Sequence, residues 1–233
     1  MNGNALISDF KKLLREPLML LFMAVPFLAI AAVKALAVFG FPLLLRYTGF
    51  DITPYLGYIE GFMVLLSPGM LGAVTAFMMI DERDDGIYTL MSVTPLGFRG
   101  YIANRLMMPF VLSMAYTLVS HLILNLVTVH PLSLMVLLVV SGMQGISTAL
   151  ILFTIADDKV KGLTLAKMLD SLMITSAGDL LGIPWVSVVC GALPFYWTTK
   201  LMLAPPAAGV IIVSLGVNAL WVLIALVLAE KRR

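Results

Sequence analysis

The sequence predicts an all-α integral membrane protein that forms a single transmembrane domain over residues 1–233. Three observations support this fold class. Hydrophobic residues make up 61% of the chain and charged residues only 12%, whereas a soluble domain carries about 25% charged residues. The mean hydropathy is +1.04. Apolar runs of about 20 residues or more, each long enough to cross a bilayer, alternate with short polar segments.

Residues 1–16 are expected to form an interfacial helix. Leu6, Phe10, Leu13 and Leu14 recur at helical spacing on one face, and the charged residues fall largely elsewhere. Such a helix lies in the headgroup plane with its cations toward anionic lipid; the alternative is an ordinary solvated helix end. No signal-peptide cleavage site follows, so we expect the first membrane segment to be retained.

Six membrane spans are expected. The first is longer than a bilayer requires, and its Lys34 would either snorkel to the headgroups or contact a substrate. The second contains Ser67-Pro68-Gly69, which is expected to kink it. The third and fourth are joined by a short turn at His130-Pro131 and should form a helical hairpin. The predicted spans are residues 17–45, 61–80, 106–129, 132–156, 163–183 and 207–229.

The fifth span is the most polar, and a broken apolar segment follows it. Lys167 and Asp170 lie three positions apart and are expected to pair on one helix face. Residues 184–206 are apolar enough to enter the membrane but are divided near Leu193-Pro194. This pattern predicts a re-entrant helical hairpin before the last span, because irregular backbone is tolerated at membrane depth where protein covers it.

The distribution of Lys and Arg predicts the orientation. Six spans place the N-terminus, residues 81–105, residues 157–167 and the C-terminus on one side. That side has twelve Lys and Arg residues and the other has two, so the positive-inside rule predicts that both termini are cytoplasmic. We expect the membrane to be the plasma membrane. The twelve are Lys11, Lys12, Arg15, Arg83, Arg99, Arg105, Lys159, Lys161, Lys167, Lys231, Arg232 and Arg233; the two are Arg46 and Lys200.

Residues 81–105, between the second and third spans, begin with the charged run Asp81-Glu82-Arg83-Asp84-Asp85. So many charges are too costly for the bilayer interior, so this segment must face water, and we expect it to bind a partner. The alternatives are a solvated loop without a partner and a magnesium site, since carboxylates are ligands for hard cations. Consecutive acids interrupted by Arg83 are poorly spaced for a metal enzyme.

No catalytic or metal site is expected in this chain. The sequence has no Gly-x-x-x-x-Gly-Lys-Ser/Thr stretch, so it should not bind nucleotide phosphates in a P-loop. His121 and His130 have no acidic or histidine companion at ligand spacing, and no Gly-x-Ser-x-Gly elbow occurs. We therefore expect no cofactor on this chain, and no nucleic acid among its partners.

Motif residues occur within and after the second span, at the entry to the fifth span and before the last span. They are Pro68, Leu71, Gly72, Glu82, Arg83, Asp84, Gly86, Leu90, Thr94, Pro95, Leu96, Tyr101, Arg105, Lys161-Gly162-Leu163-Thr164-Leu165-Ala166-Lys167, Leu193-Pro194, Trp197 and Lys200. Through these residues essentially the whole chain resembles the membrane subunits of type-2 ABC exporters, the ABC-2 permease family. It is most similar to small drug-export permeases described as fluoroquinolone export subunits. It departs at Ile87-Tyr88, where the family more often has Thr-Leu and then an acid, and at Arg105, where lysine is commoner.

The resemblance implies that residues 81–105 contain a cytoplasmic coupling helix, which docks in a cleft of a separate ATP-binding subunit. Gly86 would allow the turn into this helix, and Pro95 would end it. Two ATP-binding subunits, carrying ATP and Mg, would serve two permeases, in a homodimer or a heterodimer embedded in membrane lipid. The expected docking residues are Glu82, Arg83, Asp84, Asp85, Gly86, Ile87, Leu90, Met91, Thr94, Pro95 and Arg99.

The function implied is ATP-driven export of a hydrophobic or amphipathic substrate, whether drug, peptide or lipid. The alternative is a stand-alone secondary transporter, which would be expected to show an internal repeat. Candidate polar contacts along the substrate path are Asn125, Gln144, Asp170, Thr175 and Asp179. The competing interpretation of these five residues is hydrogen bonding between helices, which is common for polar side chains in membranes.

Overall fold

The computed structural model describes residues 17–87 and 97–231, and all of the regular structure in these ranges is helical. This confirms the predicted all-α membrane fold. The interfacial helix expected over residues 1–16 lies outside the described residues. The helices are α2 (Pro17–Ala35), the π-helical turn η1 (Leu36–Gly40), α3 (Phe41–Thr48), η2 (Thr53–Tyr55), α4 (Leu56–Asp84), α6 (Gly97–Leu124), α7 (Pro131–Ile155), α8 (Lys159–Leu172), η3 (Met173–Leu181), α9 (Pro184–Gly191), α10 (Tyr196–Leu203) and α11 (Ala208–Lys231).

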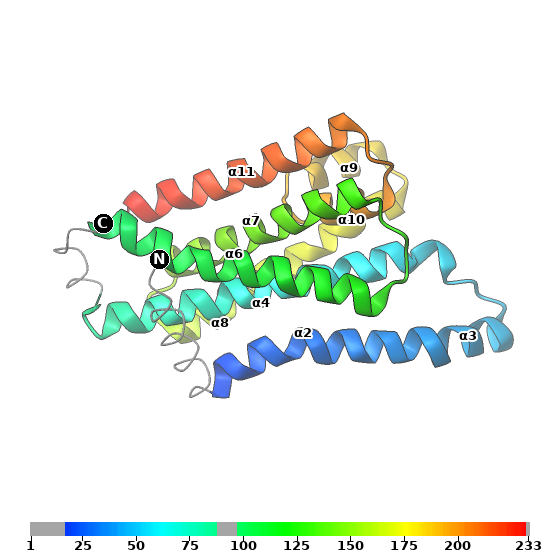
Figure 1. Cartoon of the computed structure of the whole chain (residues 1–233), viewed down its shortest axis with the longest axis horizontal. Coiled ribbons are helices and arrows are strands. Elements are labelled where there is room, and N and C mark those ends of the chain that lie inside the picture. Colours follow the sequence, from blue (N-terminus) through cyan, green and yellow to red (C-terminus); the bar gives the residue numbers. More distant parts are fainter. Residues whose placement is uncertain (1–16, 88–96, 232–233) are drawn as a thin grey trace.

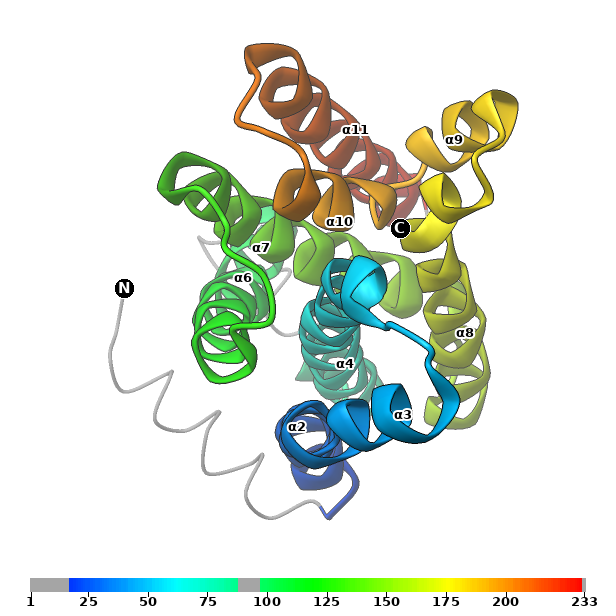
Figure 2. The same cartoon turned by 90° about the vertical axis from the view of Figure 1, so that its right-hand side faces the viewer.

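Helices α4 and α7 form the centre of the bundle, and the other long helices surround them (Figures 1 and 2). Most of α4 and α7 is buried, whereas α2 and α11 are mostly exposed on the outside. The described start of α2 and the end of α11 lie at the same end of the bundle in Figure 1, and α9 and α10 lie at the other end. We refer to these as the charged end and the hairpin end.

The central pair packs closely because small residues face each other. A Cβ added at Gly72 of α4 would lie 2.7 Å from the Thr148 Cβ and 2.8 Å from the Gly145 carbonyl oxygen of α7. Both distances are too short for a real side chain. Close backbone approach through small residues is the usual way in which helices associate in a membrane.

We expect Gly72→Leu to destabilise the protein by roughly 1–3 kcal/mol or more, because the new side chain would force α4 and α7 apart. Gly209→Leu in α11 is the matched control, since a Cβ placed there has no described atom within 4 Å apart from its chain neighbours and its own helix backbone. The free energy of unfolding in detergent checks the prediction. Equal stability of the two variants would contradict it.

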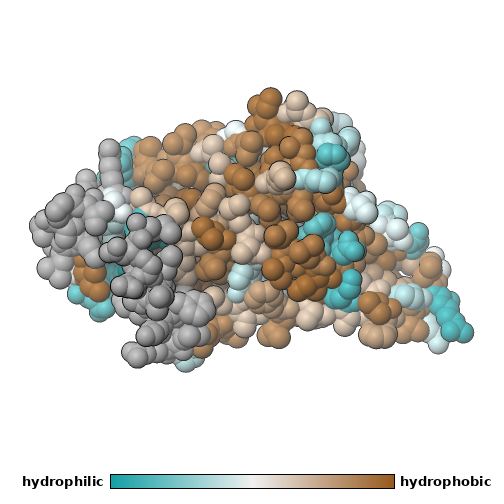
Figure 3. Space-filling model, viewed as in Figure 1, coloured by the Kyte–Doolittle hydropathy of each residue, from teal (hydrophilic) through white to brown (hydrophobic). Residues whose placement is uncertain are grey.

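Five single helical segments are long and apolar enough to cross a membrane, and the bent pair α9–α10 would make a sixth. Apolar side chains cover most of the face shown in Figure 3. Helices α9 and α10 meet at 115° across the break that follows Gly191. The division predicted near Leu193-Pro194 is thus present. The five single segments are Met19–Thr48, Thr53–Asp84, Gly100–Leu124, Pro131–Ile155 and Ala208–Lys231.

The predicted fifth span, residues 163–183, is not among the helices that meet these criteria of length and composition. It is divided into α8, with 14 residues, and η3, a 3₁₀ segment of nine residues. At Gly178 an added Cβ would lie 2.6 Å from the Cys190 Sγ of α9. Segment η3 is a tighter 3₁₀ helix, which is uncommon at this length, and its Gly178 packs directly against α9 of the hairpin.

Two other predicted boundaries differ from the structure. The third span ends at Leu124 rather than Val129, because Asn125 adopts a left-handed conformation with φ 43° and its amide donates to the His121 carbonyl. Asparagine is one of the few residues that tolerate this conformation at a helix end. The second span starts at Leu56 and continues through Pro68 to Asp84, so the first charged residues of the 81–105 segment belong to helix α4.

Candidate partner-docking site

The last turn of α4 is fastened to α6 by a buried acid. Glu82 is 3% exposed, and its Oε2 accepts hydrogen bonds from the Tyr101 hydroxyl at 2.8 Å and from the Arg105 Nε at 2.9 Å. A second Arg105 nitrogen donates to Glu82 Oε1, so the guanidinium binds both carboxylate oxygens. Bidentate pairs of this kind are strong and fix geometry.

The neighbouring residues fasten the same turn to α7 and α8. Arg83 donates to the carbonyl oxygens of Ala156 at 3.1 Å and Asp157 at 2.7 Å, just beyond the C-terminus of α7. Its guanidinium also lies over the Phe153 ring, 5.6 Å from the ring centre. Asp81 pairs with Lys159, the first residue of α8, at 2.8 Å. Four helices therefore meet at this charged end.

The chain leaves this junction abruptly. The Asp85 amide donates to the Asp81 carbonyl and the Gly86 amide to the Arg83 carbonyl. Gly86 has φ 72°, a left-handed conformation that glycine adopts at little cost. The predicted turn at Gly86 is thus present.

The structure places the expected docking residues in three groups. Glu82 is buried, and Arg83 is directed to the end of α7, so these two side chains hold the junction together. Asp84 and Asp85 are exposed, and Gly86 and Ile87 are half-buried. Arg99 lies in α6, but its side chain is outside the described part of the molecule. Leu90, Met91, Thr94 and Pro95 also lie outside the described residues.

Two of the expected substrate-path residues hold the α9–α10 hairpin. Gln144 is buried in α7, and its Nε2 donates to the Pro194 carbonyl at 3.0 Å and to the Thr198 hydroxyl at 3.1 Å. Asp179 of η3 accepts hydrogen bonds from the Tyr196 hydroxyl at 2.8 Å and from the Lys200 ammonium at 2.7 Å. The structure therefore uses both side chains for hydrogen bonds between helices.

The other three expected substrate-path residues lie apart from one another. Asn125 is exposed beyond the end of α6, and the Thr175 hydroxyl donates to the Leu172 carbonyl within its own turn. Asp170 is half-buried on α8. The ion pair expected between Lys167 and Asp170 is not formed: Lys167 is exposed, and Asp170 has no hydrogen-bond or ion-pair partner within residues 17–87 and 97–231.

A second buried acid, at the hairpin end of α4, is not among the residues predicted from the sequence. Glu60 is fully buried; its Oε1 lies 2.6 Å from the His121 Nδ1, and its Oε2 accepts from the amides of Leu126 and Val127 at 2.8 and 3.0 Å. Lys34 also binds here, donating to the Leu124 carbonyl at 2.8 Å. The predicted spans leave Glu60 out, and the residues near His121 give no sign of this contact, because the two residues are 61 positions apart.

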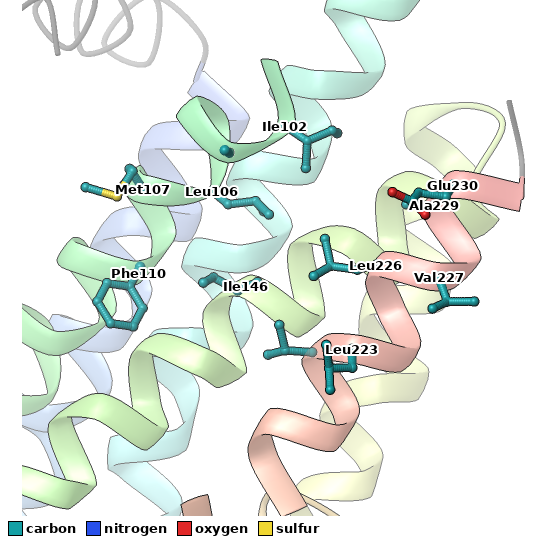
Figure 4. A pocket seen from close by; sticks show the side chains of 12 residues that line it. Ile102, Leu106, Met107, Phe110, Ile146, Leu223, Leu226, Val227, Ala229 and Glu230 are labelled. Atoms are coloured by element: carbon teal, nitrogen blue, oxygen red, sulfur yellow. The ribbon is translucent and has the colours of Figure 1, made fainter. Parts of the chain in front are cut away.

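An apolar groove of about 670 Å³ opens between α6, α7 and α11 (Figure 4). Its walls include Phe110 of α6, Ile146 of α7 and Leu223 of α11, and Glu230 lies at its charged end. The groove is within the size range of small-molecule sites, which are mostly apolar with few polar groups.

Comparison with known proteins identifies the family. The model of the family "Fluoroquinolones export permease protein Rv2686c-like" matches residues 9–229. The chain belongs to this family. It is also 30% identical over 202 residues to two Mycobacterium tuberculosis proteins, fluoroquinolones export permease proteins Rv2686c (strain H37Rv) and MT2760 (strain CDC 1551). Each alignment covers 83% of this chain and 78% of the relative. No solved structure matches the permease.

Proposed function

We propose that the chain is the membrane-spanning subunit of an ATP-driven exporter that moves amphipathic drugs, including fluoroquinolones, out of the cytoplasm. Membership of an export permease family supports the transport role, and the relatives' names supply the substrate class. The energy source would be a separate ATP-binding subunit, present in two copies with its own ATP and Mg, because this sequence contains no P-loop. A second permease, identical or different, would complete the complex.

The observation that carries this proposal is the junction at the charged end. Glu82–Arg105 joins α4 to α6, and Arg83 and Asp81 join α4 to the ends of α7 and α8. Any force applied between Gly86 and Gly97 would act on four helices together. A base connected in this way would allow a partner to move the helices as a rigid body. We therefore place the ATPase contact on the segment that leaves this junction.

The charged end would face the cytoplasm. Most of the described Lys and Arg residues lie toward this end, among them Arg83, Arg105, Lys159, Lys161 and Lys231, whereas Lys34, Arg46 and Lys200 lie toward the hairpin end. The positive-inside rule then supports a plasma-membrane protein with cytoplasmic termini. Lipid, or a second permease, would cover the exposed apolar faces of α2 and α11.

We expect Leu90→Asp and Met91→Asp to reduce co-purification of the ATP-binding subunit at least about tenfold without changing membrane insertion, since both are expected docking residues and burying an unpaired charge in a contact costs more than about 1.4 kcal/mol. Phe50→Asp is the control, because it adds the same charge to an exposed loop at the hairpin end. The measurement is affinity purification of the tagged permease from native membranes.

Two outcomes would overturn the proposal. Unchanged assembly in both loop variants would place the ATPase contact elsewhere. Drug export that persists after ATP depletion, by a permease that co-purifies with no ATPase, would instead identify a stand-alone secondary transporter.

A further inference from the structure

Asp170 lies on the protein-facing stripe of α8. Gly162 and Ala166, eight and four positions before it, are the two buried residues of this helix, and this spacing places all three on one face. Opposite them is α4: a Cβ added at Gly69 would lie 3.1 Å from the Asp170 Oδ1 and 2.5 Å from the Met173 Cε. The carboxylate therefore approaches α4 where the missing side chain of Gly69 leaves room.

Asp170 differs from the other acids in the body of the bundle. Glu60 binds His121 and two amides, Glu82 binds Arg105 and Tyr101, and Asp179 binds Lys200 and Tyr196. In the part of the chain that the structure describes, Asp170 alone among these four has no such partner. A carboxylate inside a membrane is costly unless a cation or a proton compensates it.

The depth of Asp170 also fits a substrate site. It lies eleven residues after the first residue of α8, or about 17 Å along the helix at 1.5 Å per residue, which is about half of a 30 Å hydrocarbon core. Helix α8 passes into the 3₁₀ segment η3 at Met173, three residues after Asp170, and Pro68 of the continuous helix α4 has no amide to donate to the Val64 carbonyl. Transporters commonly bind substrates at mid-membrane beside interrupted helices.

We propose that Asp170 is the anchor of a cation-binding subsite, which takes the protonated amine of an amphipathic substrate. The ammonium would donate to the carboxylate, and the apolar part of the molecule would lie along α4 and α8. Asp170 is half-buried rather than sealed, so a ligand can reach it. This inference rests on the proposed function, because it assumes that the permease carries small amphipathic molecules.

A binding measurement on the purified full-length permease in lipid nanodiscs tests this site without the ATPase. The probes are a dansyl amide whose tail ends in a dimethylammonium group and its carbon isostere, whose tail ends in an isopropyl group. We expect the cationic probe to bind at least about tenfold more tightly, as a charge-assisted hydrogen bond predicts. Asp170→Asn should abolish this preference, and Asp170→Glu should retain part of it.

Asp51→Asn is the matched control, since it removes the same charge from an exposed loop at the hairpin end and should leave both affinities unchanged. Equal binding of the two probes to the unmodified permease would overturn the proposal, as would equal loss of both probes in Asp170→Asn. The proposed function fails separately: a cation preference that depends on Asp170, in a protein whose transport needs no ATP, would keep the subsite and remove the ATPase.

Discussion

Glu82→Ala is expected to destabilise the permease by about 3–5 kcal/mol, the usual cost of removing one partner from a buried ion pair. Glu82 is 3% exposed, and both of its carboxylate oxygens bind Arg105. The alanine variant leaves the guanidinium and the Tyr101 hydroxyl without the acceptor that now holds them. The free energy of unfolding, from a denaturing-detergent titration of the purified protein, measures the effect.

Three further variants isolate the contribution of the pair. Asp84→Ala, in the same turn but exposed, should change stability by no more than about 0.5 kcal/mol. Glu82→Gln keeps an acceptor for Tyr101 but not the charge, so its loss of stability should lie between those of Glu82→Ala and Asp84→Ala. Replacing both partners, as Glu82→Leu with Arg105→Met, should cost less than Glu82→Ala alone, because no charge is left buried and unpaired. If Glu82→Ala and Asp84→Ala were equally stable, the junction would not depend on this pair.

The corresponding change at the hairpin end, Glu60→Ala, has the second largest expected effect. Glu60 accepts the amides of Leu126 and Val127, which follow the left-handed residue that ends α6. Each amide left without an acceptor costs about 1–3 kcal/mol. We also expect these two amides to exchange their hydrogens with solvent at least about tenfold faster, because opening of this end would become correspondingly easier.

Hydrogen exchange followed by mass spectrometry gives this local measurement. The Thr53 amide, which binds the Asp51 carboxylate in the neighbouring loop, is the internal reference and should exchange at an unchanged rate. Glu60→Gln keeps one carbonyl acceptor and should show a smaller increase. Faster exchange across the entire bundle in Glu60→Ala would indicate global unfolding, and would contradict a local role for Glu60.

These two acids show where prediction from the sequence stopped. Glu82 was predicted to be a site residue, because it stands in a charged run that a membrane interior does not tolerate. It was expected at the surface. The structure buries it against Arg105, 23 residues later. Glu60 falls outside the predicted spans and site residues, since nothing within a few residues of it indicates a partner. Its partners lie 61 to 67 positions away.

The hairpin shows the opposite case. The break near Leu193-Pro194 was predicted correctly, because a proline removes a backbone donor and favours a break through local geometry, although α4 continues through Pro68. The same reasoning could not show that Gln144 holds this break through the Pro194 carbonyl, 50 residues away. Nor could it show that residues 163–183 would divide into α8 and η3, since that division accompanies the close packing of Gly178 against Cys190.

The sequence by itself determined the membrane class, the all-helical fold, the position of most spans and the segregation of positive charge to one end. Each of these follows from hydrophobicity, chain length and local backbone preference, which act over about 20 residues. Only the tertiary structure decided which polar side chains are paired: Glu82 with Arg105, Glu60 with His121, and Asp170 with no partner in the described residues. The physical reason is that pairing depends on which helices come into contact, and that depends on packing between residues far apart in the chain.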